Sequence, residues 1–366
     1  MILTRKYRIK DSSSAAKLSK ISHSVNRVWN YCNEANIKSV DYNQKWLSNF
    51  DLHKLTSGVA SDLGLVSETV QGVADEYVIK RRKFKKKKLS WRGKKSLGWI
   101  PFKKQSIKYL GEGKVKYNKT LFQFWETQFV GTIKCGSFNQ DSRGRWYVNL
   151  VCEVDPYHYA KTGKSIGVDL GLKATATYSD GTSFVGSKST KEYEDRLAMA
   201  QRAGKKKRTK VIHAKIANTR KDSLHKETLR LVKEYDLIVV GNVSSKGLIK
   251  TRMAKSVQDV SWGAYKTLLA YKTIRFGKEM KVVNESWTSR TCSACLERSG
   301  PSGLSGLSVR EWQCSCGASH DRDVNAAKNI LRIGHDTPIK GIPVKEGCQS
   351  PYYRTNTQVS ITEVKE

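Results

Sequence analysis

The first part of the chain switches between the two hydrophobic periodicities that distinguish strands from helices. Residues 1–11 alternate apolar and basic side chains, which is the pattern of a strand with one face in water. A segment follows in which apolar residues recur every three or four positions, as on one face of a helix. Alternating segments then return. We therefore predict a small β barrel, built from residues 1–12 and 96–160, that carries a helical insertion in residues 13–95.

The predicted barrel strands are short. They are expected at residues 106–109, 114–117, 122–125 and 146–151, with a glycine-containing hairpin turn at 141–145. Basic and aromatic side chains are interleaved along them, a combination that suits contacts with a nucleic-acid backbone and stacking on bases. The alternative is that these aromatics belong to the hydrophobic core.

In the second half of the chain the pattern becomes that of an α/β domain. Strands are expected at residues 165–171, 236–241 and 281–285, and helices at about 192–235, 256–277 and 324–331. A hairpin after the first strand completes an order that is typical of ribonuclease H-like domains. The predicted fold class is therefore multi-domain α+β. Residues 336–366 contain Pro and Gly without periodicity, which predicts a flexible tail.

Several acids stand at positions that suit a metal site. Asp169 ends the first apolar strand, and Asp323 would open the last helix, where it could also act as a simple cap. The three strands are expected to be parallel neighbours, so their carboxyl ends share one edge. The second strand ends in Gly241, whereas the third ends in Glu285, which is either a metal ligand or an exposed charge. Converging carboxylates that hold two Mg²⁺ ions are the chemistry of phosphodiester cleavage.

Four cysteines form two close pairs, Cys292-x2-Cys295 and Cys314-x-Cys316. One Zn²⁺ needs four soft ligands in a tetrahedron, and two pairs joined by a loop supply them in a zinc ribbon, residues 291–319. Disulfides are the alternative. We favour the metal because the start of the chain does not look like a secretory signal, so we expect a cytoplasmic protein with reduced thiols. The other cysteines are expected to be small apolar fillers: Cys32, Cys135, Cys152 and Cys348.

Basic side chains greatly exceed acidic ones. The chain has 67 Lys and Arg against 33 Asp and Glu, a formal net charge of +34 over 366 residues. Phosphates relieve the self-repulsion of such a surface, so nucleic acid is the expected partner. A membrane surface is the alternative, but the sequence has no run of about 18 apolar residues that would span a bilayer.

The order of these motifs resembles TnpB, the RNA-guided nuclease encoded by insertion sequences, and the compact type V CRISPR effectors descended from it. The resemblance covers most of residues 1–335. It rests on the following segments: 166–171, 220–222 and 225–226 of the basic helix, 237–241, 287–295, 314–317 and 320–331. It implies a RuvC nuclease domain in residues 161–290 and 320–335, interrupted by a zinc ribbon that binds target nucleic acid. It also implies that the barrel is a wedge domain and the helical insertion a recognition domain.

The resemblance also suggests roles for single acids. The family's first RuvC aspartate falls on Asp169, and the Asp of its Asp-x-Asn-Ala-Ala motif falls on Asp323, which favours a metal ligand over a cap. Its usual glutamate meets Gly241 instead. In some members this acid has moved to the next strand, where Glu285 stands, so Glu285 is our prediction for the third ligand. Asp321 is expected to support the site.

The function implied by the resemblance is RNA-guided, Mg²⁺-dependent DNA cleavage. A guide RNA would pair with target DNA beside a short motif that the barrel and helices read. Candidate RNA or heteroduplex contacts, with a plain solvated face as the alternative, are Lys205, Lys206, Lys207, Arg208, Arg220 and Lys221. If Glu285 does not reach the metals, the protein would be a nuclease-inactive RNA-guided DNA-binding repressor. A guide-independent, structure-specific nuclease is a third possibility.

Overall fold

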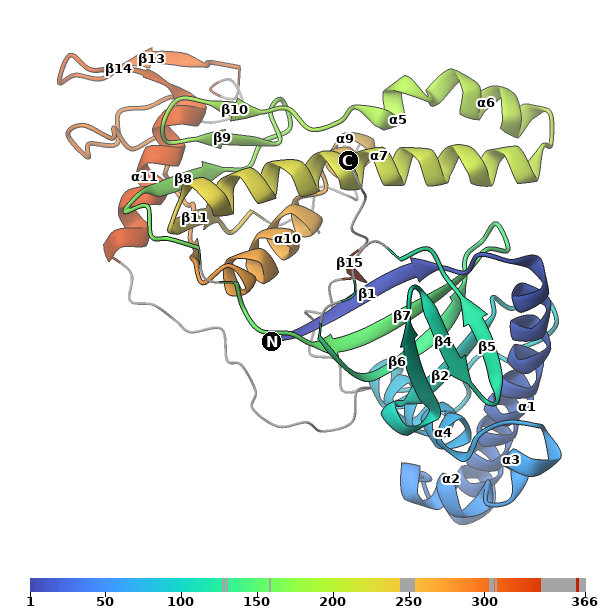
Figure 1. The fold of residues 1–366 in the computed structure, drawn as a ribbon. Helices are drawn as coiled ribbons and strands as arrows, with labels where there is room; N and C mark the ends of the chain where they lie inside the picture. Colours follow the sequence, from blue (N-terminus) through green and yellow to red (C-terminus); the bar gives the residue numbers. More distant parts are fainter. Residues whose placement is uncertain are drawn as a thin grey trace. The chain divides into compact units, whose positions relative to one another are not determined.

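The chain folds into two compact units, shown in Figure 1. The computed structural model describes residues 1–126, 129, 131–157, 159–243, 254–302, 306, 308–336 and 360–361. The first unit contains Met1–Asp155 together with the short strand β15 (Ser360–Ile361), and the second contains the described residues from 156 to 336. Both units mix helices with strands, which confirms a multi-domain α+β protein. No helix among the described residues is long and apolar enough to cross a membrane.

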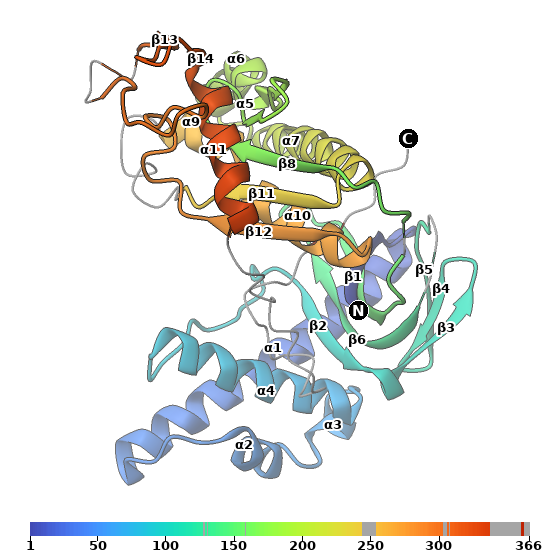
Figure 2. The same ribbon diagram turned by 90° about the vertical axis from the view of Figure 1, so that its left-hand side faces the viewer.

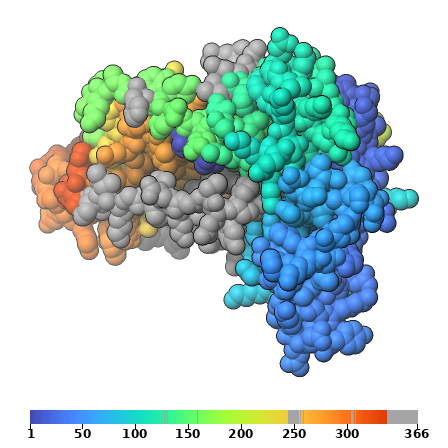
Figure 3. All heavy atoms as spheres, turned by 60° about the horizontal axis from the view of Figure 1, so that its bottom comes forward, coloured from blue at the N-terminus to red at the C-terminus, as the bar shows by residue number. Residues whose placement is uncertain are grey.

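The predicted helical insertion is present in the first unit. It consists of α1 (Ser12–Asn43), α2 (Asn49–Leu55), α3 (Val59–Asp62) and α4 (Ser67–Phe84). Helices α1 and α4 bury their apolar faces against each other, and Trp29 meets Tyr77 edge-on at 5.3 Å between ring centroids. In Figure 3 the light-blue atoms of α2 and α3 stand out from the teal strands of the same unit.

The strands of the predicted barrel lie in two sheets. One sheet has the order β15-β1-β7-β6-β2, and the other has the order β3-β4-β5. The larger contains β1 (Ile2–Arg8), β2 (Trp99–Lys103), β6 (Thr132–Gln140) and β7 (Trp146–Glu153), and the smaller contains β3 (Ile107–Gly111), β4 (Lys114–Tyr117) and β5 (Thr120–Gln123). Between β2 and β3 lies a 3-10 turn, η1 (Lys104–Ser106). The two sheets are joined where Ile9 forms a bridge with Phe124.

Two of these strands were not predicted. β2 contains Pro101, which cannot donate a hydrogen bond, and it is tolerated because β2 is an edge strand. β6 has few apolar residues and therefore little alternation. Phe138 on β6 packs against Phe102 and Phe122 at 5.3 and 5.2 Å between ring centroids, and all three rings are buried. These aromatics thus belong to the core between the sheets rather than to a surface for bases.

The second unit is built on a sheet of the order β10-β9-β8-β11-β12. Its strands are β8 (Ser165–Asp169), β9 (Ala176–Tyr178), β10 (Ser183–Phe184), β11 (Leu237–Gly241) and β12 (Glu279–Val283). β8, β11 and β12 are parallel neighbours, as predicted, with Val168 opposite Val240 and Gly241 opposite Val283. Their carboxyl ends therefore lie along one edge of the sheet.

Helices cover both faces of this sheet (Figure 2). α11 (Arg322–Asp336) crosses β8, β11 and β12 on one face, while α7 (Lys206–Glu234) and α10 (Trp262–Arg275) lie on the other. α11 approaches β8 so closely that a Cβ at Gly167 would lie 2.1 Å from the Ala327 carbonyl oxygen. The remaining elements are α5 (Ser189–Glu192), α6 (Glu194–Arg202), α9 (Ala254–Val260), β13 (Glu311–Gln313) and β14 (Ser319–Asp321). The helix predicted at 192–235 is thus broken between α6 and α7.

The predicted C-terminal tail falls almost entirely outside the described residues. Within residues 336–366, the structure describes Asp336, which ends α11, and β15, which pairs in parallel with β1.

Candidate active site and metal centre

Three acids come to the carboxyl edge of the parallel strands from three separate elements. Asp169 is the last residue of β8, Glu285 follows β12 by two residues, and Asp323 lies in the first turn of α11. Burial raises the pKa of Asp169 to about 7, and the negative charges of Asp323 and Glu285 add to this rise. Asp169 therefore lies close enough to the other two predicted acids to sense their charge.

The Glu285 carboxylate lies over Gly241, at the end of β11. A Cβ at Gly241 would be 2.2 Å from Glu285 Oε2, so this carboxylate fills the space of a side chain at position 241. Burial raises the pKa of Glu285, against a backbone hydrogen bond from Val243 and the charge of Lys266. Its Oε2 is buried and has no hydrogen-bond partner in the described part of the chain. A buried, unpaired carboxylate oxygen is costly, and a cation would satisfy it.

Asp323 is paired with Arg310. The Arg310 Nη1 donates to both carboxylate oxygens, at 3.0 and 2.9 Å. Asp323 does not act as the helix cap. Asp321 takes that part, because its Oδ1 accepts from the backbone N–H groups of Asp323 and Val324 at 2.9 Å each. Sequence reasoning missed Arg310, which lies in an irregular stretch that belongs to none of the motifs.

The carboxylates are spaced more widely than the cysteines. In the described ranges, the four predicted cysteines form a group whose ligand atoms all lie within 4.8 Å of one another, and no such group contains the three acids. Repulsion between like charges favours this wider spacing of the carboxylates, and the ion pair with Arg310 holds the Asp323 carboxylate. The ligands of a two-ion site are also distributed over both ions. Because the ions are about 3.5–4 Å apart, the carboxylate oxygens need not lie as close together as the ligands of a single ion. The donor set of hard carboxylate oxygens, one of them buried and unpaired, fits Mg²⁺.

Two buried asparagines tie the loop after Glu285 to α11. The Nδ2 groups of Asn325 and Asn329 both donate to the carbonyl oxygens of Thr288 and Thr291, at 2.6 to 3.2 Å. Asn325 Oδ1 also accepts from the Ser293 backbone at 2.8 Å. These bonds fix the segment that links Glu285 to the first cysteine pair, on the same helix that carries Asp323.

We expect Asn325→Ala to destabilise this arrangement. The substitution leaves the Ser293 N–H and two carbonyl oxygens without one partner each, at a cost of about 1–3 kcal/mol. Thermal unfolding of the full chain should therefore begin several degrees lower. Lys328→Ala, at an exposed position of the same helix, is the control. Equal midpoints for the two variants would contradict the proposed tether.

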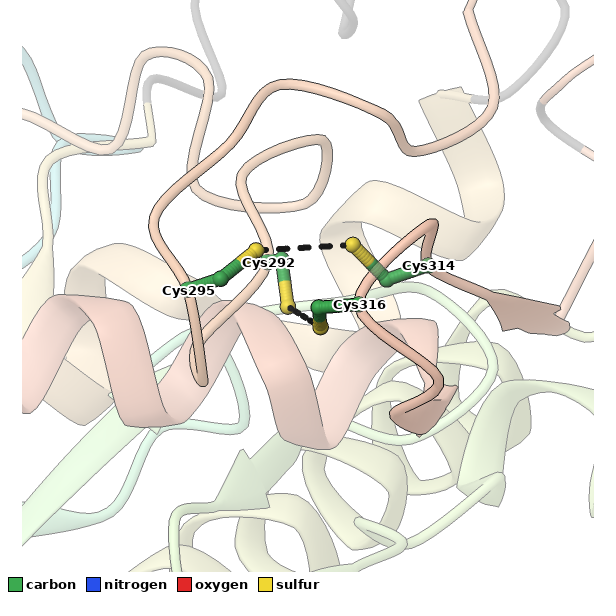
Figure 4. A group of neighbouring side chains, drawn as sticks. All are labelled: Cys292, Cys295, Cys314 and Cys316. Atoms are coloured by element: carbon green, nitrogen blue, oxygen red, sulfur yellow. Dashed lines mark hydrogen bonds between the residues drawn. The ribbon is translucent and has the colours of Figure 1, made fainter.

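The four cysteines lie together as predicted (Figure 4). They point toward one another from two loops, with Cys295–Cys314 and Cys292–Cys316 sulfur separations of 3.5 and 3.8 Å. All are free thiols in the structure. Four sulfurs at about 2.3 Å from a tetrahedral Zn²⁺ would be about 3.8 Å apart, so the cluster fits that ion.

The remaining described cysteines behave as apolar fillers. Cys32, Cys135 and Cys152 are buried, and burial raises the pKa of Cys32 to about 12 and that of Cys152 to about 11. Thiols of this kind stay protonated and unreactive. Cys348 lies outside the described residues.

The predicted nucleic-acid contacts differ in their surroundings. Lys205, Lys206, Lys207 and Arg208 are exposed where α7 begins. Arg220, by contrast, is already engaged within the unit, since it pairs with Asp259 at 3.0 Å and donates to Thr190. Lys221 is only partly exposed and has interactions of its own within the protein.

Two family matches fall on the segments that carry these residues. Residues 262–330 match the Cas12f1-like TNB domain, a segment that includes Glu285, Asp323 and the four cysteines. Residues 149–252, which include Asp169, match the insertion-sequence family described as "Probable transposase". Both matches support the resemblance to TnpB and the compact type V effectors, each over less than half of the chain.

Two curated relatives carry names that describe a nuclease. A "Putative RNA-guided DNA endonuclease" of Streptomyces pristinaespiralis is 37% identical over 210 residues, 54% of this chain and 52% of that protein. The "Putative RNA-guided DNA endonuclease InsQ" of Escherichia coli (strain K12) is 30% identical over 252 residues, 60% of this chain and 61% of that protein. The chain thus spans between about half and three fifths of the length of these relatives.

A solved structure has a similar fold. In a Cas12f1–sgRNA–target DNA complex, one chain matches with a TM-score of 0.58 at 12% identity, over 88% of this chain and 83% of that chain. At this identity the similarity concerns the fold alone. It confirms a Cas12-like, multi-domain α+β architecture.

Proposed function

We propose that this chain is an RNA-guided DNA endonuclease of the TnpB family, with Asp169, Glu285 and Asp323 as its catalytic metal ligands. One observation carries the proposal: carboxylates from β8, from the loop after β12 and from α11 reach one edge of a parallel sheet, where Asp169 senses the charge of the other two. Like charges gathered at one edge raise one another's energy, and of the three acids the structure pairs Asp323 with a cation, Arg310. The three acids suit divalent cations.

The chemistry needs both the metals and the protein. Two Mg²⁺ ions, when bound, would stabilise the attacking and leaving oxygens of a phosphodiester. The chain holds the ligands in place: Lys266 Nζ donates to the carbonyl oxygens of Gly241 and Val243, at 3.2 and 2.8 Å, and so fixes the backbone below Glu285. Arg310 brings a positive charge to the acids, which would otherwise repel a phosphate.

The other parts of the chain receive the following proposed roles. Residues 161–290 and 320–335 form the RuvC nuclease domain, and residues 291–319 form a zinc ribbon that binds target nucleic acid. Residues 1–12 and 96–160 form the wedge barrel, and residues 13–95 the recognition domain, which together read a short motif on duplex DNA. The net charge of +34 supports binding to a guide RNA and its heteroduplex with target DNA, to which the exposed Lys205–Arg208 segment is suited.

The test of this function starts from the RNA that copurifies with the protein. Its sequence defines a guide, and a plasmid library with a matching target beside randomised flanking bases reports cleavage in Mg²⁺. We expect cutting beside one short motif by the wild type and none by Asp169→Ala, with DNA binding retained. Binding without cutting by the wild type would favour a repressor, and cutting without any RNA would favour a guide-independent nuclease.

Arg310→Ala is expected to slow cleavage about 100-fold. Removal of a group that stabilises charge in an active site commonly has an effect of this size. The scissile phosphate would then meet the acids without the guanidinium beside Asp323. The measurement is the single-turnover rate over a range of Mg²⁺ concentrations. Arg310→Lys should retain part of the rate, and Arg332→Ala, an exposed charge on α11, should retain all of it. If Arg310→Ala cut faster than the wild type at low Mg²⁺, Arg310 would merely keep Mg²⁺ from binding Asp323.

A further inference from the structure

Trp287 stands out in the loop between Glu285 and the cysteines. Half of its surface, 50%, is exposed, although a large aromatic side chain normally gains from burial. Its backbone adopts φ of +70°, the left-handed region that non-glycine residues rarely occupy. Residues held in such conformations cluster at functional sites. The exposed ring and the unfavourable backbone are two separate observations at one residue.

The loop holds this ring on a rigid base. The Trp287 carbonyl oxygen accepts from the backbone N–H groups of Arg290 and Thr291, at 3.0 and 2.9 Å, and from the Thr291 hydroxyl at 3.0 Å. Thr288 Oγ1 donates to the Glu285 carbonyl at 2.8 Å. The Thr288 and Thr291 carbonyls are in turn bound to α11 through Asn325 and Asn329. An exposed aromatic ring on an ordered turn is a preformed surface for a ligand.

Positive charge surrounds the ring. The guanidinium carbons of Arg290 and Arg298 each lie 5.1 Å from the centre of the Trp287 ring. Arg290 Nε is buried without a hydrogen-bond partner in the described residues, and Arg298 is exposed. A flat apolar surface beside two guanidinium groups matches a nucleotide, whose base stacks on aromatic rings and whose phosphate binds arginine.

We propose that Trp287, with Arg290 and Arg298, binds an unpaired base of the DNA strand that is being cut. The inference rests on the proposed nuclease function, because Trp287 is two residues from Glu285, at most about 7 Å away along the backbone. In a duplex both faces of a base are covered by its neighbours, so only an unstacked base can lie on Trp287. The site holds the single strand close to the carboxylates and tolerates any base sequence.

The test combines protein variants with abasic sites in the substrate. With the full chain, its guide RNA and Mg²⁺, an abasic site is placed in turn at each nucleotide near the scissile phosphate of the cut strand. For the wild type, we expect one position at which the missing base slows single-turnover cleavage about tenfold, which is typical of losing one base–aromatic contact. Trp287→Ala should be about tenfold slower on the intact strand and insensitive to the abasic site at that position.

Matched variants separate stacking from folding. Trp287→Phe keeps an aromatic face and should stay within about threefold of the wild type, whereas Trp287→Leu keeps apolar bulk and should behave like Trp287→Ala. Leu296→Ala is the control, because Leu296 is 48% exposed and also has φ of +70°, in the same cysteine-containing segment. It should cut and respond to abasic sites as the wild type does. Wild-type rates for Trp287→Ala and Trp287→Leu would overturn the proposal, as would an abasic effect that persists in both.

A second readout does not depend on cleavage. The same strand with 2-aminopurine at the identified position, or in turn at positions near the predicted cut, is bound without added Mg²⁺ and without a chelator, so that the zinc stays in place. Stacking should quench its fluorescence with the wild type, Trp287→Phe and Leu296→Ala, but not with Trp287→Leu. If quenching followed this pattern but the wild type did not cut, the proposed nuclease function would be refuted and the base-binding site at Trp287 would be supported. If cutting required Asp169 but quenching did not depend on Trp287, the base-binding site would be refuted and the proposed nuclease function would be supported.

Discussion

Glu285→Ala is expected to abolish DNA cleavage, by about 1,000-fold or more, and Gly241→Glu in the same chain is expected to restore part of it. Loss of groups that only support metal ligands commonly costs about 10- to 100-fold, and loss of a ligand itself should cost more. The rescue is expected because the Glu285 carboxylate lies where a side chain at position 241 would be. Single-turnover cleavage of a guide-matched target in Mg²⁺ measures both effects.

The single and double variants at positions 241 and 285 are expected to differ in their cleavage rates. Gly241→Glu alone should impair the enzyme, since its Cβ would lie 2.2 Å from Glu285 Oε2 and its charge would repel that carboxylate. With alanine at position 285, this space becomes available to the new side chain. The control, Gly241→Ala with Glu285→Ala, fills the space without a carboxylate and should remain inactive. Wild-type cutting by Glu285→Ala would refute our placement of the third acid, and equal inactivity of the two double variants would refute the shared position.

Local patterns in the sequence were sufficient to place Asp169 and Glu285 at one edge, whereas the choice of Asp323 as a ligand rested on the resemblance to TnpB. The apolar runs ending in Asp169 and Gly241 predict parallel strands, and the register confirms them. The carboxyl ends of all three strands then lie at one edge, and Glu285 was predicted as a ligand because the third strand ends there. This works because each inference depends on a single segment and on the geometry of parallel sheets.

Contacts between distant segments were not visible in the sequence. Arg310 meets Asp323 only because the cysteine-containing segment returns to the start of α11, and nothing in the residues around Arg310 indicates a partner. Asp321 and Asp323 are both suited to capping, and which one caps depends on where the helix begins. The two-sheet arrangement in the first unit likewise depends on β6, whose weak alternation hides the central packing position of Phe138.

Loss of the cysteine cluster should have the other large effect. Cys314→Ser is expected to remove zinc and to reduce cleavage at least about 100-fold, because zinc binding in small structural sites contributes about 10–16 kcal/mol, as much as holds a whole domain folded. The cluster lies between two of the acids: Cys292 follows Glu285 by seven residues, and Cys316 precedes Asp323 by seven. We expect the loops that carry Trp287 and Arg310 to depend on the same four sulfurs for their shape.

The measurement is zinc content together with cleavage. The wild type should hold one Zn²⁺ per chain and lose it, with its activity, to a strong chelator. Cys135→Ala is the matched control, since Cys135 is equally buried but lies on β6 in the first unit. It should keep both zinc and activity. A zinc-free Cys314→Ser protein that cuts at the wild-type rate would show that Glu285, Arg310 and Asp323 keep their places without the metal. The Asn325 and Asn329 tether to α11 would then be sufficient to hold the loop.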